Sequence, residues 1–255
     1  MKNYLHYLRN RRSKYYIHSP FVFSFINDVL NDDREFYCYE EIESLRKNLL
    51  RSKDKIDVQD FGAGSVMGPA SIRKISSIAK TSAAPAKYSK LLFRIVNHFR
   101  SNKILELGTS LGISTAYLSA WSNEAEVVTL EGSLSVTEQA KKNFSYLGRN
   151  NINLINGRFE DKLSSTVQQM KKIDFLFLDG NHRLSPTLSY FETCLPYLHQ
   201  DSIVVLDDIH WSEEMLEAWN EIISRPEVTL SFDLFRLGIL FFRKDRVKEN
   251  FTLWF

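Results

Sequence analysis

The sequence predicts an α/β fold in which helices cover both faces of a seven-stranded sheet, with only the last strand antiparallel, after a helical N-terminal extension. The first observation is that short apolar runs alternate with helical stretches from residue 103 onward. This is the pattern of parallel strands joined by crossover helices. The second is that only a few residues separate the last two runs. A connection of that length makes a hairpin, so the seventh strand must run antiparallel to the sixth.

The expected elements divide the chain into an extension, residues 1–80, and a domain, residues 81–255. The extension reads as short helices, among them an amphipathic segment at 39–52. Further helices are expected at about 71–80 and 84–99. The strands of the domain are expected at 103–107, 126–130, 152–156, 173–178, 202–206, 228–232 and 237–242. The helices between them are expected at 111–121, 134–147, 160–171, 186–199 and 213–224.

Charge and composition limit the classes of function. The 255 residues include 33 Lys and Arg against 31 Asp and Glu, a net charge of +2, which does not favour nucleic acid as a partner. The basic run RNRRSK at 9–14 is interpreted as a solvated helix face. No apolar run reaches the ~18 residues of a membrane helix. We therefore expect no membrane contact. Cys38 and Cys194 are far apart and lack the spacing of a zinc site, so we expect reduced thiols and a cytoplasmic protein.

The stretch ILELGTSLGIS at 104–114 is the most informative part of the sequence. Gly108 and Gly112 bracket a turn between a buried strand and a helix, where small residues let backbone N–H groups approach a ligand. The spacing is neither the G-x-G-x-x-G of dinucleotide sites nor the phosphate loop of nucleotide triphosphatases. A second glycine-rich stretch, VQDFGAGS at 58–65, has no acidic strand end after it and is interpreted as a loop of the extension.

Two acidic residues near the glycine loop indicate the ligand. Glu131 ends the second strand 23 residues after Gly108, where a carboxylate can accept both hydroxyls of a ribose. Glu106, at the end of the first strand, can bind the ammonium group of an amino acid. A ligand with a ribose and an ammonium group but no pyrophosphate is S-adenosylmethionine. The alternative is that Glu131 faces solvent and that the glycines form an ordinary turn.

Residues 103–243 resemble class I S-adenosylmethionine-dependent methyltransferases, and more narrowly the catechol and caffeoyl-CoA type of O-methyltransferase. ILELGTSLGIS resembles the first glycine motif of that family, VVTLEGS its ribose-binding strand end, and NGRFED the loop beside adenine. The resemblance implies a Rossmann-like, doubly wound sheet. It also implies that the following residues bind the cofactor: Glu106, Gly108, Thr109, Ser110, Gly112, Ser114, Glu131, Gly132, Arg158, Phe159 and Asp179.

Asp179, Asp207 and Asp208 follow two neighbouring parallel strands, so their carboxylates should converge at one edge of the sheet. Oxygen ligands of this kind suit Mg²⁺ or Ca²⁺. In the similar O-methyltransferases, the matching positions bind a divalent ion that chelates the acceptor hydroxyls. The chain departs from that pattern, with Asp208 where the family has Asn and His182 near the position of its basic lysine. The alternative is that Asp179 orients the methionine moiety while Asp207 and Asp208 cap the next helix.

Two histidines in the same loops, His182 and His210, are candidates for the general base, since an imidazole titrates near pH ~6.5. His182 is preferred because its position lies on the acceptor side, and Asp179 is its expected catalytic partner. The resemblance further implies that the segment 82–90 crosses over the bound cofactor.

The leading functional hypothesis is an S-adenosylmethionine-dependent methyltransferase that acts on an oxygen of a small molecule. One alternative is methylation of RNA or protein, with the N-terminal helices as the recognition module. Another is a glycine-loop reductase, which the missing G-x-G-x-x-G disfavours. The last is a cofactor-binding interaction domain that has lost its chemistry.

Overall fold

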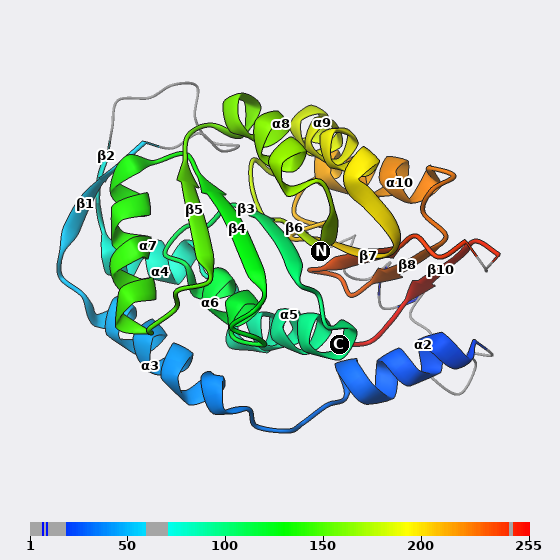
Figure 1. The fold of residues 1–255 in the computed structure, drawn as a ribbon, viewed down its shortest axis with the longest axis horizontal. Coiled ribbons are helices and arrows are strands. Elements are labelled where there is room, and N and C mark those ends of the chain that lie inside the picture. The colour runs from blue at the N-terminus through cyan, green and yellow to red at the C-terminus, as the bar shows by residue number, and fades with distance from the viewer. Residues whose placement is uncertain (1–6, 8, 10–18, 60–70, 245–246) are drawn as a thin grey trace. The chain divides into compact units, whose positions relative to one another are not determined.

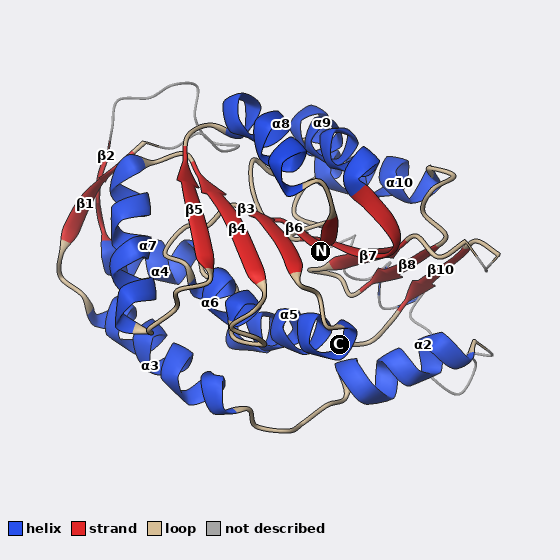
Figure 2. Ribbon diagram, viewed as in Figure 1, coloured by secondary structure: helices blue, strands red, loops and turns tan. Residues whose placement is uncertain are grey.

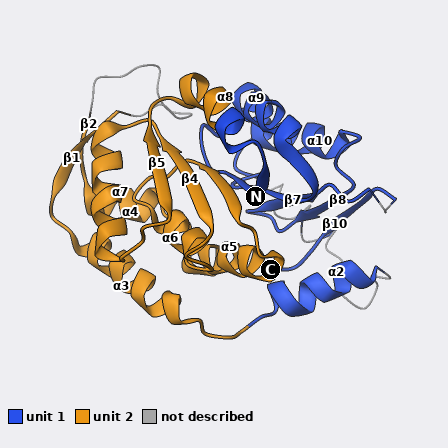
Figure 3. Cartoon of the chain, viewed as in Figure 1, with its two compact units in different colours: residues 1–32, 167–255 blue, residues 33–166 orange. Residues whose placement is uncertain are grey.

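The computed structural model describes residues 7, 9, 19–59, 71–244 and 247–255 (Figure 1). They form two compact units (Figure 3). Unit 1 contains residues 1–32 and 167–255, and unit 2 contains residues 33–166. Of the loop expected at 58–65, only Val58 and Gln59 are described, and Val58 ends a strand instead. Of the basic run at 9–14, only Arg9 is among the described residues. The helices and strands are coloured in Figure 2.

Unit 2 has three parallel strands at its centre, β3 (Lys103–Leu107), β4 (Glu126–Glu131) and β5 (Ile152–Asn156), in the order β3-β4-β5. They are joined by α6 (Ile113–Ser119) and α7 (Leu134–Tyr146), and α8 (Phe159–Met170) follows β5. These strands and connections agree with the sequence prediction. The register pairs Leu107 with Leu130 and Glu131 with Asn156, which brings the carboxyl ends of all three strands to one edge.

The N-terminal extension contributes α3 (Tyr37–Arg51) and most of α4 (Ile75–Ser82) to unit 2, and α5 (Ala86–Phe99) follows in the chain. The apolar face of α3 is buried, including Ile42 and Leu45, and it belongs to the same cluster as Phe93 of α5 and Tyr117 of α6. The extension therefore shares a hydrophobic core with the helix that follows the glycine loop. The domain boundary between residues 80 and 81 stays a prediction.

The extension also holds a two-stranded antiparallel sheet that the sequence prediction missed. β1 (Lys55–Val58) pairs with β2 (Ser71–Lys74), with Ile56 opposite Arg73. The helix expected at about 71–80 therefore begins only at Ile75, whose N–H donates to the carbonyl of Asp54. Both strands are short and largely exposed, so no alternating apolar pattern marked them in the sequence.

The described residues of unit 1 form five strands in the order β10-β8-β9-β7-β6. They are β6 (Ile173–Leu178), β7 (Leu198–Leu206), β8 (Leu230–Asp233), β9 (Gly238–Phe241) and β10 (Glu249–Thr252). β9 runs antiparallel to both β7 and β8, which confirms the predicted inversion of the seventh strand. β10 was not predicted and adds an eighth strand, parallel to β8. Its segment ENFT buries only Phe251 and carries no apolar run.

Helices cover both faces of the unit 1 strands. Phe25 of α2 (Pro20–Phe25) packs against Phe232 and Phe241, while the ring of Trp219 from α10 (Glu213–Ser224) lies over Gly238. Gly238 and Phe241 are three residues apart on β9 and so face opposite sides of the sheet. The remaining helices are η2 (Ile26–Leu30), α9 (Leu184–Cys194) and η3 (Leu195–Tyr197).

Among the described residues, no helix is both long enough and apolar enough to cross a membrane.

Cys38 and Cys194 are free, buried thiols. Burial raises the pKa of Cys38 to about 11 and that of Cys194 to about 12. Both therefore stay protonated and pack as small apolar side chains.

Candidate functional site

The glycine loop of unit 2 follows β3 and turns sharply into α6. Gly108, Ser110 and Gly112 have φ angles of 107°, 47° and 81°, in the left-handed region that glycine tolerates best. Gly112 also stands at the N-cap of α6, and a Cβ there would lie 2.4 Å from the ring of Phe144. The loop can therefore take this shape only with a residue that lacks a side chain at 112.

Side chains beneath the loop fix its position. Asn143 of α7 donates through Nδ2 to the carbonyl of Leu111 at 2.8 Å, and the hydroxyls of Thr109 and Thr129 lie 2.6 Å apart. The N–H groups of Gly108 and Thr109 both donate to the carbonyl of Leu130. The hydroxyl, N–H and carbonyl of Thr109 are all engaged within the unit. Thr109, predicted to bind a cofactor, thus shapes the loop.

Glu131 is held at the carboxyl end of β4 by two backbone amides. One carboxylate oxygen accepts from the N–H of Ser110, and the other accepts from the N–H of Ser133, both at 2.9 Å. The residue is half-buried, and each carboxylate oxygen can accept more than one hydrogen bond. The arrangement fixes the carboxylate beside the glycine loop. The predicted binding of a ribose by Glu131 stays a prediction. Ser110, Ser114 and Gly132 are likewise half-buried at this edge.

Asn156, at the end of β5, organises the same edge and was not singled out from the sequence. Its Nδ2 donates to the carbonyl of Glu131 at 3.0 Å and lies 3.3 Å from the carbonyl of Gly132. The signal was present, because Asn156 opens the NGRFED segment. Further along that segment, Arg158 is half-exposed with Glu160 at 3.6 Å, and Phe159 is half-buried at the start of α8.

Glu106 lies at the centre of a hydroxyl cluster and is fully buried. Its carboxylate accepts hydrogen bonds from Ser114 at 2.6 Å, Thr129 at 2.7 Å and Thr115. Burial raises the pKa of Glu106 to about 7, against the opposing effect of these three hydrogen bonds. These three hydroxyls occupy most of the acceptor positions of the carboxylate. The expected contact of Glu106 with a ligand ammonium group stays a prediction.

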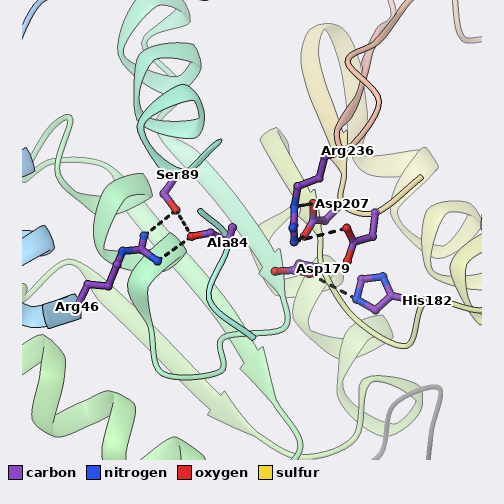
Figure 4. Close-up of polar contacts among 8 residues, drawn as sticks. Arg46, Ala84, Ser89, Asp179, His182, Asp207 and Arg236 are labelled. Carbon is purple, nitrogen blue, oxygen red and sulfur yellow. Dashed lines mark hydrogen bonds and ion pairs between the residues drawn. The ribbon is translucent and has the colours of Figure 1, made fainter. Parts of the chain in front are cut away.

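In unit 1, acidic residues follow two parallel strands. The register pairs Leu178 of β6 with Leu206 of β7, so Asp179 and Asp207 occupy equivalent positions just beyond the strand ends. Asp207 is buried, and both its oxygens accept from Arg236, at 2.9 Å from Nε and 2.7 Å from Nη2 (Figure 4). Nη2 of Arg236 also lies 3.5 Å from Asp208. Sequence reasoning missed Arg236 altogether.

The two candidate histidines have different surroundings. His182 is half-buried, with Nε2 3.6 Å from Oδ1 of Asp179 (Figure 4). His210 has a side chain only 5% exposed, with Nε2 2.8 Å from Asp233 and its ring stacked on that of Phe235. His210 is therefore a packing residue, whereas His182 keeps the exposure that a general base requires.

The predicted metal ligands do not fit a divalent ion as they are arranged. Over the part of the chain that the structure describes, no group of three or more His, Cys, Asp or Glu could hold a metal ion. Both oxygens of Asp207 are bonded to Arg236 instead. Burial, followed by the charge of Asp207, raises the pKa of Asp208. The expected helix-capping role is filled by Ser212, whose hydroxyl accepts from the N–H of Met215. The metal assignment itself stays a prediction.

Comparisons with known proteins give one family match and several structural likenesses. Residues 105–209 match a family model described as a methyltransferase domain. The O-methyltransferase from Bacillus cereus, in complex with S-adenosylhomocysteine (SAH), is 20% identical with a TM-score of 0.55, covering 86% of this chain and 96% of that one. The SAH-bound methyltransferase PaMTH1 from Podospora anserina is 14% identical with a TM-score of 0.62, covering 89% and 98%.

A third solved structure is similar over most of its length. The O-methyltransferase TomG from Streptomyces achromogenes, involved in tomaymycin synthesis and in complex with S-adenosylmethionine, is 17% identical with a TM-score of 0.58, covering 82% of this chain and 91% of that one. No curated protein matches this sequence significantly. The likenesses confirm the predicted fold class, a Rossmann-like α/β fold with a helical N-terminal part.

The first prediction concerns the glycine loop. Gly112→Ala should lower the free energy of unfolding by about 1–3 kcal/mol, because a strained φ and contact with Phe144 add together. Gly148→Ala is the matched control, since Gly148 has φ +63° but a Cβ added there would meet nothing within 4 Å. Denaturant unfolding of both variants measures the difference. Equal losses would show that the contact with Phe144 is unimportant.

The second prediction concerns Glu106. A carboxyl whose pKa is about 7 when folded, against an ordinary 4.5, keeps a proton that the unfolded chain releases. Its contribution to stability is therefore present at acid pH and declines as pH rises from about 4.5 to 7. As pH rises through that interval, the free energy of unfolding of Glu106→Gln should increase relative to that of wild type by on the order of 1–3 kcal/mol. Urea unfolding at several pH values tests this, with Glu124→Gln as an exposed control. Parallel pH profiles of Glu106→Gln and wild type would contradict it.

Proposed function

We propose that this methyltransferase, whose family match spans residues 105–209, uses S-adenosylmethionine to methylate an oxygen of a small molecule. The observation that carries the proposal is the fixed carboxylate of Glu131 beside the glycine loop. Two backbone amides orient it, at 2.9 Å each. A carboxylate oriented in this way can accept the two hydroxyls of the cofactor ribose.

The rest of the cofactor would be bound by neighbouring groups of the same edge. Gly108, Ser110 and Gly112 leave the loop backbone open to close approach. We assign Gly132 and Phe159 to the adenosine, and Ser114, in the first turn of α6, to the same ligand. We assign Arg158 to the adenine end and Glu106 to the amino-acid end. The contact of Asp179 with the cofactor stays a prediction from the sequence. The solved O-methyltransferases from Bacillus cereus and Streptomyces achromogenes, bound to SAH and S-adenosylmethionine, support the choice of cofactor.

Methyl transfer needs alignment of the reactants and a base for the acceptor. The acceptor oxygen attacks the methyl carbon, the bond from sulfur to that carbon breaks, and SAH leaves. His182 takes the proton of the acceptor hydroxyl. Its Nε2 faces Asp179, so Nδ1 is the ring nitrogen assigned to receive the proton. Asp179 stabilises the imidazolium that forms.

The segment 82–90 is proposed to cover the bound cofactor. It is anchored by Arg46 of α3, which donates to the carbonyl of Ala84 at 2.7 Å and to the hydroxyl of Ser89 at 3.1 Å (Figure 4). Both contacts are buried, whereas Lys87 between them is exposed. The segment is thus fixed at two points with an accessible stretch between them, which suits a cover that closes over a ligand.

The third prediction tests the cofactor site. Glu131→Ala should weaken SAH binding by about 1.5–3 kcal/mol, the range for hydrogen bonds to a charged group. Titration calorimetry measures the affinity, and Glu124→Ala is the control because it removes the same charge from an exposed loop. An unchanged affinity would contradict the role of Glu131. Tighter binding of NADH than of SAH would contradict the methyltransferase cofactor altogether.

The fourth prediction tests the cover. Amide exchange in residues 82–90 should slow when SAH is added, because the closed segment loses contact with water. Exchange in α10 serves as the internal reference. Equal exchange with and without SAH would contradict the proposed cover and indicate that the segment has only a structural role.

The acceptor class has its own test. Transfer of a labelled methyl group should appear on hydroxylated small molecules and not on RNA or protein. Label in RNA or protein would instead support the N-terminal helices as a macromolecular recognition module.

A further inference from the structure

The acidic residues after β7 contact an arginine from the turn of the β8–β9 hairpin. β9 pairs antiparallel with β7, with Gly238 opposite Leu206. Continuing that register by two residues places Arg236 opposite Asp208, beyond the last ladder pair. The guanidinium therefore reaches the acidic residues as a consequence of strand pairing, and not through a flexible loop.

The backbone of the hairpin turn holds Arg236 in this place. Phe235 has φ +68° and its N–H donates to Oδ1 of Asp233 at 2.8 Å, and the N–H of Leu234 donates to the carbonyl of Leu237. The carbonyl of Arg236 accepts from the N–H of Ile209 at 3.1 Å. Arg236 is thus tied to the loop after β7 by both its backbone and its side chain.

The guanidinium is the partner that the buried carboxylate requires. Asp207 is 1% exposed and receives two hydrogen bonds in the paired geometry that suits arginine and a carboxylate. Burial opposes the charged form of Arg236, but the hydrogen bond to Asp207 and the charges of Asp207, Asp208 and Asp179 raise its pKa beyond the ordinary range.

We propose that Arg236 is the resident cation of this cluster, taking the place of a divalent ion, and that its removal opens a cation site formed by Asp179, Asp207 and Asp208. A guanidinium offers no coordination position and does not lower the pKa of a bound hydroxyl as a metal ion does. Deprotonation of the acceptor then depends on His182. This last step rests on the proposed function, whereas the cation site does not.

Thermal unfolding with added Mn²⁺, Mg²⁺ or EDTA tests the cation site. The melting temperature of wild type should be the same in all three conditions. Arg236→Ala should melt several degrees lower in EDTA, because it leaves a buried carboxylate unpaired, and Mn²⁺ should recover part of that loss. In titrations, Mn²⁺ should bind Arg236→Ala at least about tenfold more tightly than wild type. Arg236→Lys is the matched control, since it keeps the positive charge and should not respond to metal.

A second substitution locates the ion. Adding Asp207→Asn to Arg236→Ala should abolish the recovery by Mn²⁺. If Arg236→Ala does not fold, Arg236→Gln retains most of the side-chain volume and is measured in its place. Stabilisation of wild type by Mg²⁺ or Mn²⁺ that is lost in Asp207→Asn would overturn the proposal. A failure of every neutral Arg236 variant to respond to metal would overturn it too.

Binding of SAH in EDTA separates this inference from the proposed function. Wild type should bind SAH equally well with EDTA and with Mg²⁺, and methyl transfer should continue in EDTA. Binding or transfer that needs Mg²⁺ would refute the inference and leave the cofactor assignment intact. Absence of SAH binding under every condition would refute the proposed function, while the Mn²⁺ response of the Arg236 variants would still be measurable.

Discussion

A carboxylate can leave water only if donors or an opposite charge replace the water, and this constraint governs the strand ends of both units. Parallel strands gather their carboxyl ends at one edge, where this chain places several acidic residues. Each of three acids is satisfied differently. Glu106 accepts from three hydroxyls, Glu131 from two backbone amides, and Asp207 from a guanidinium. The surrounding loops take the shapes that deliver those donors.

The N-terminal extension obeys the same constraint inside unit 2. Glu43 of α3 accepts from Nε of Arg46 at 3.0 Å and from the hydroxyl of Tyr117 at 2.9 Å. Burial, together with the charge of Glu43, raises the pKa of Tyr117, so the phenol remains a donor. Tyr117 lies on α6, directly after the glycine loop. The extension is therefore connected to the helix after the glycine loop by polar contacts as well as by the shared hydrophobic core.

Much of the architecture could be predicted because it depends on local pattern. The apolar runs that became β3 to β9 are each short and bounded by helices or turns, and a connection of a few residues leaves a hairpin as the only choice. The turn at the glycine loop and the strand end at Glu131 could be predicted because both depend on spacing along the chain. β1, β2 and β10 were missed because exposed or edge strands bury few side chains and show no alternation. Helix α4 begins late for the same reason, since Ser71–Lys74 is paired.

The partners of the acids were beyond prediction for a different reason. Asn156 and Arg236 act at positions fixed by register between strands far apart in sequence, and Arg236 meets Asp207 only because β9 lies between β7 and β8. The sequence therefore could not distinguish whether an Asp or Glu at a strand end is a metal ligand, a ribose acceptor or a member of a structural ion pair. The role of each acid depends on the groups that donate hydrogen bonds to it. Burial lets Glu106 hold a proton near neutrality, although the hydroxyls that donate to it favour the charged form. Amides around Glu131 orient its carboxylate, and the guanidinium on Asp207 occupies the oxygens that a metal would need.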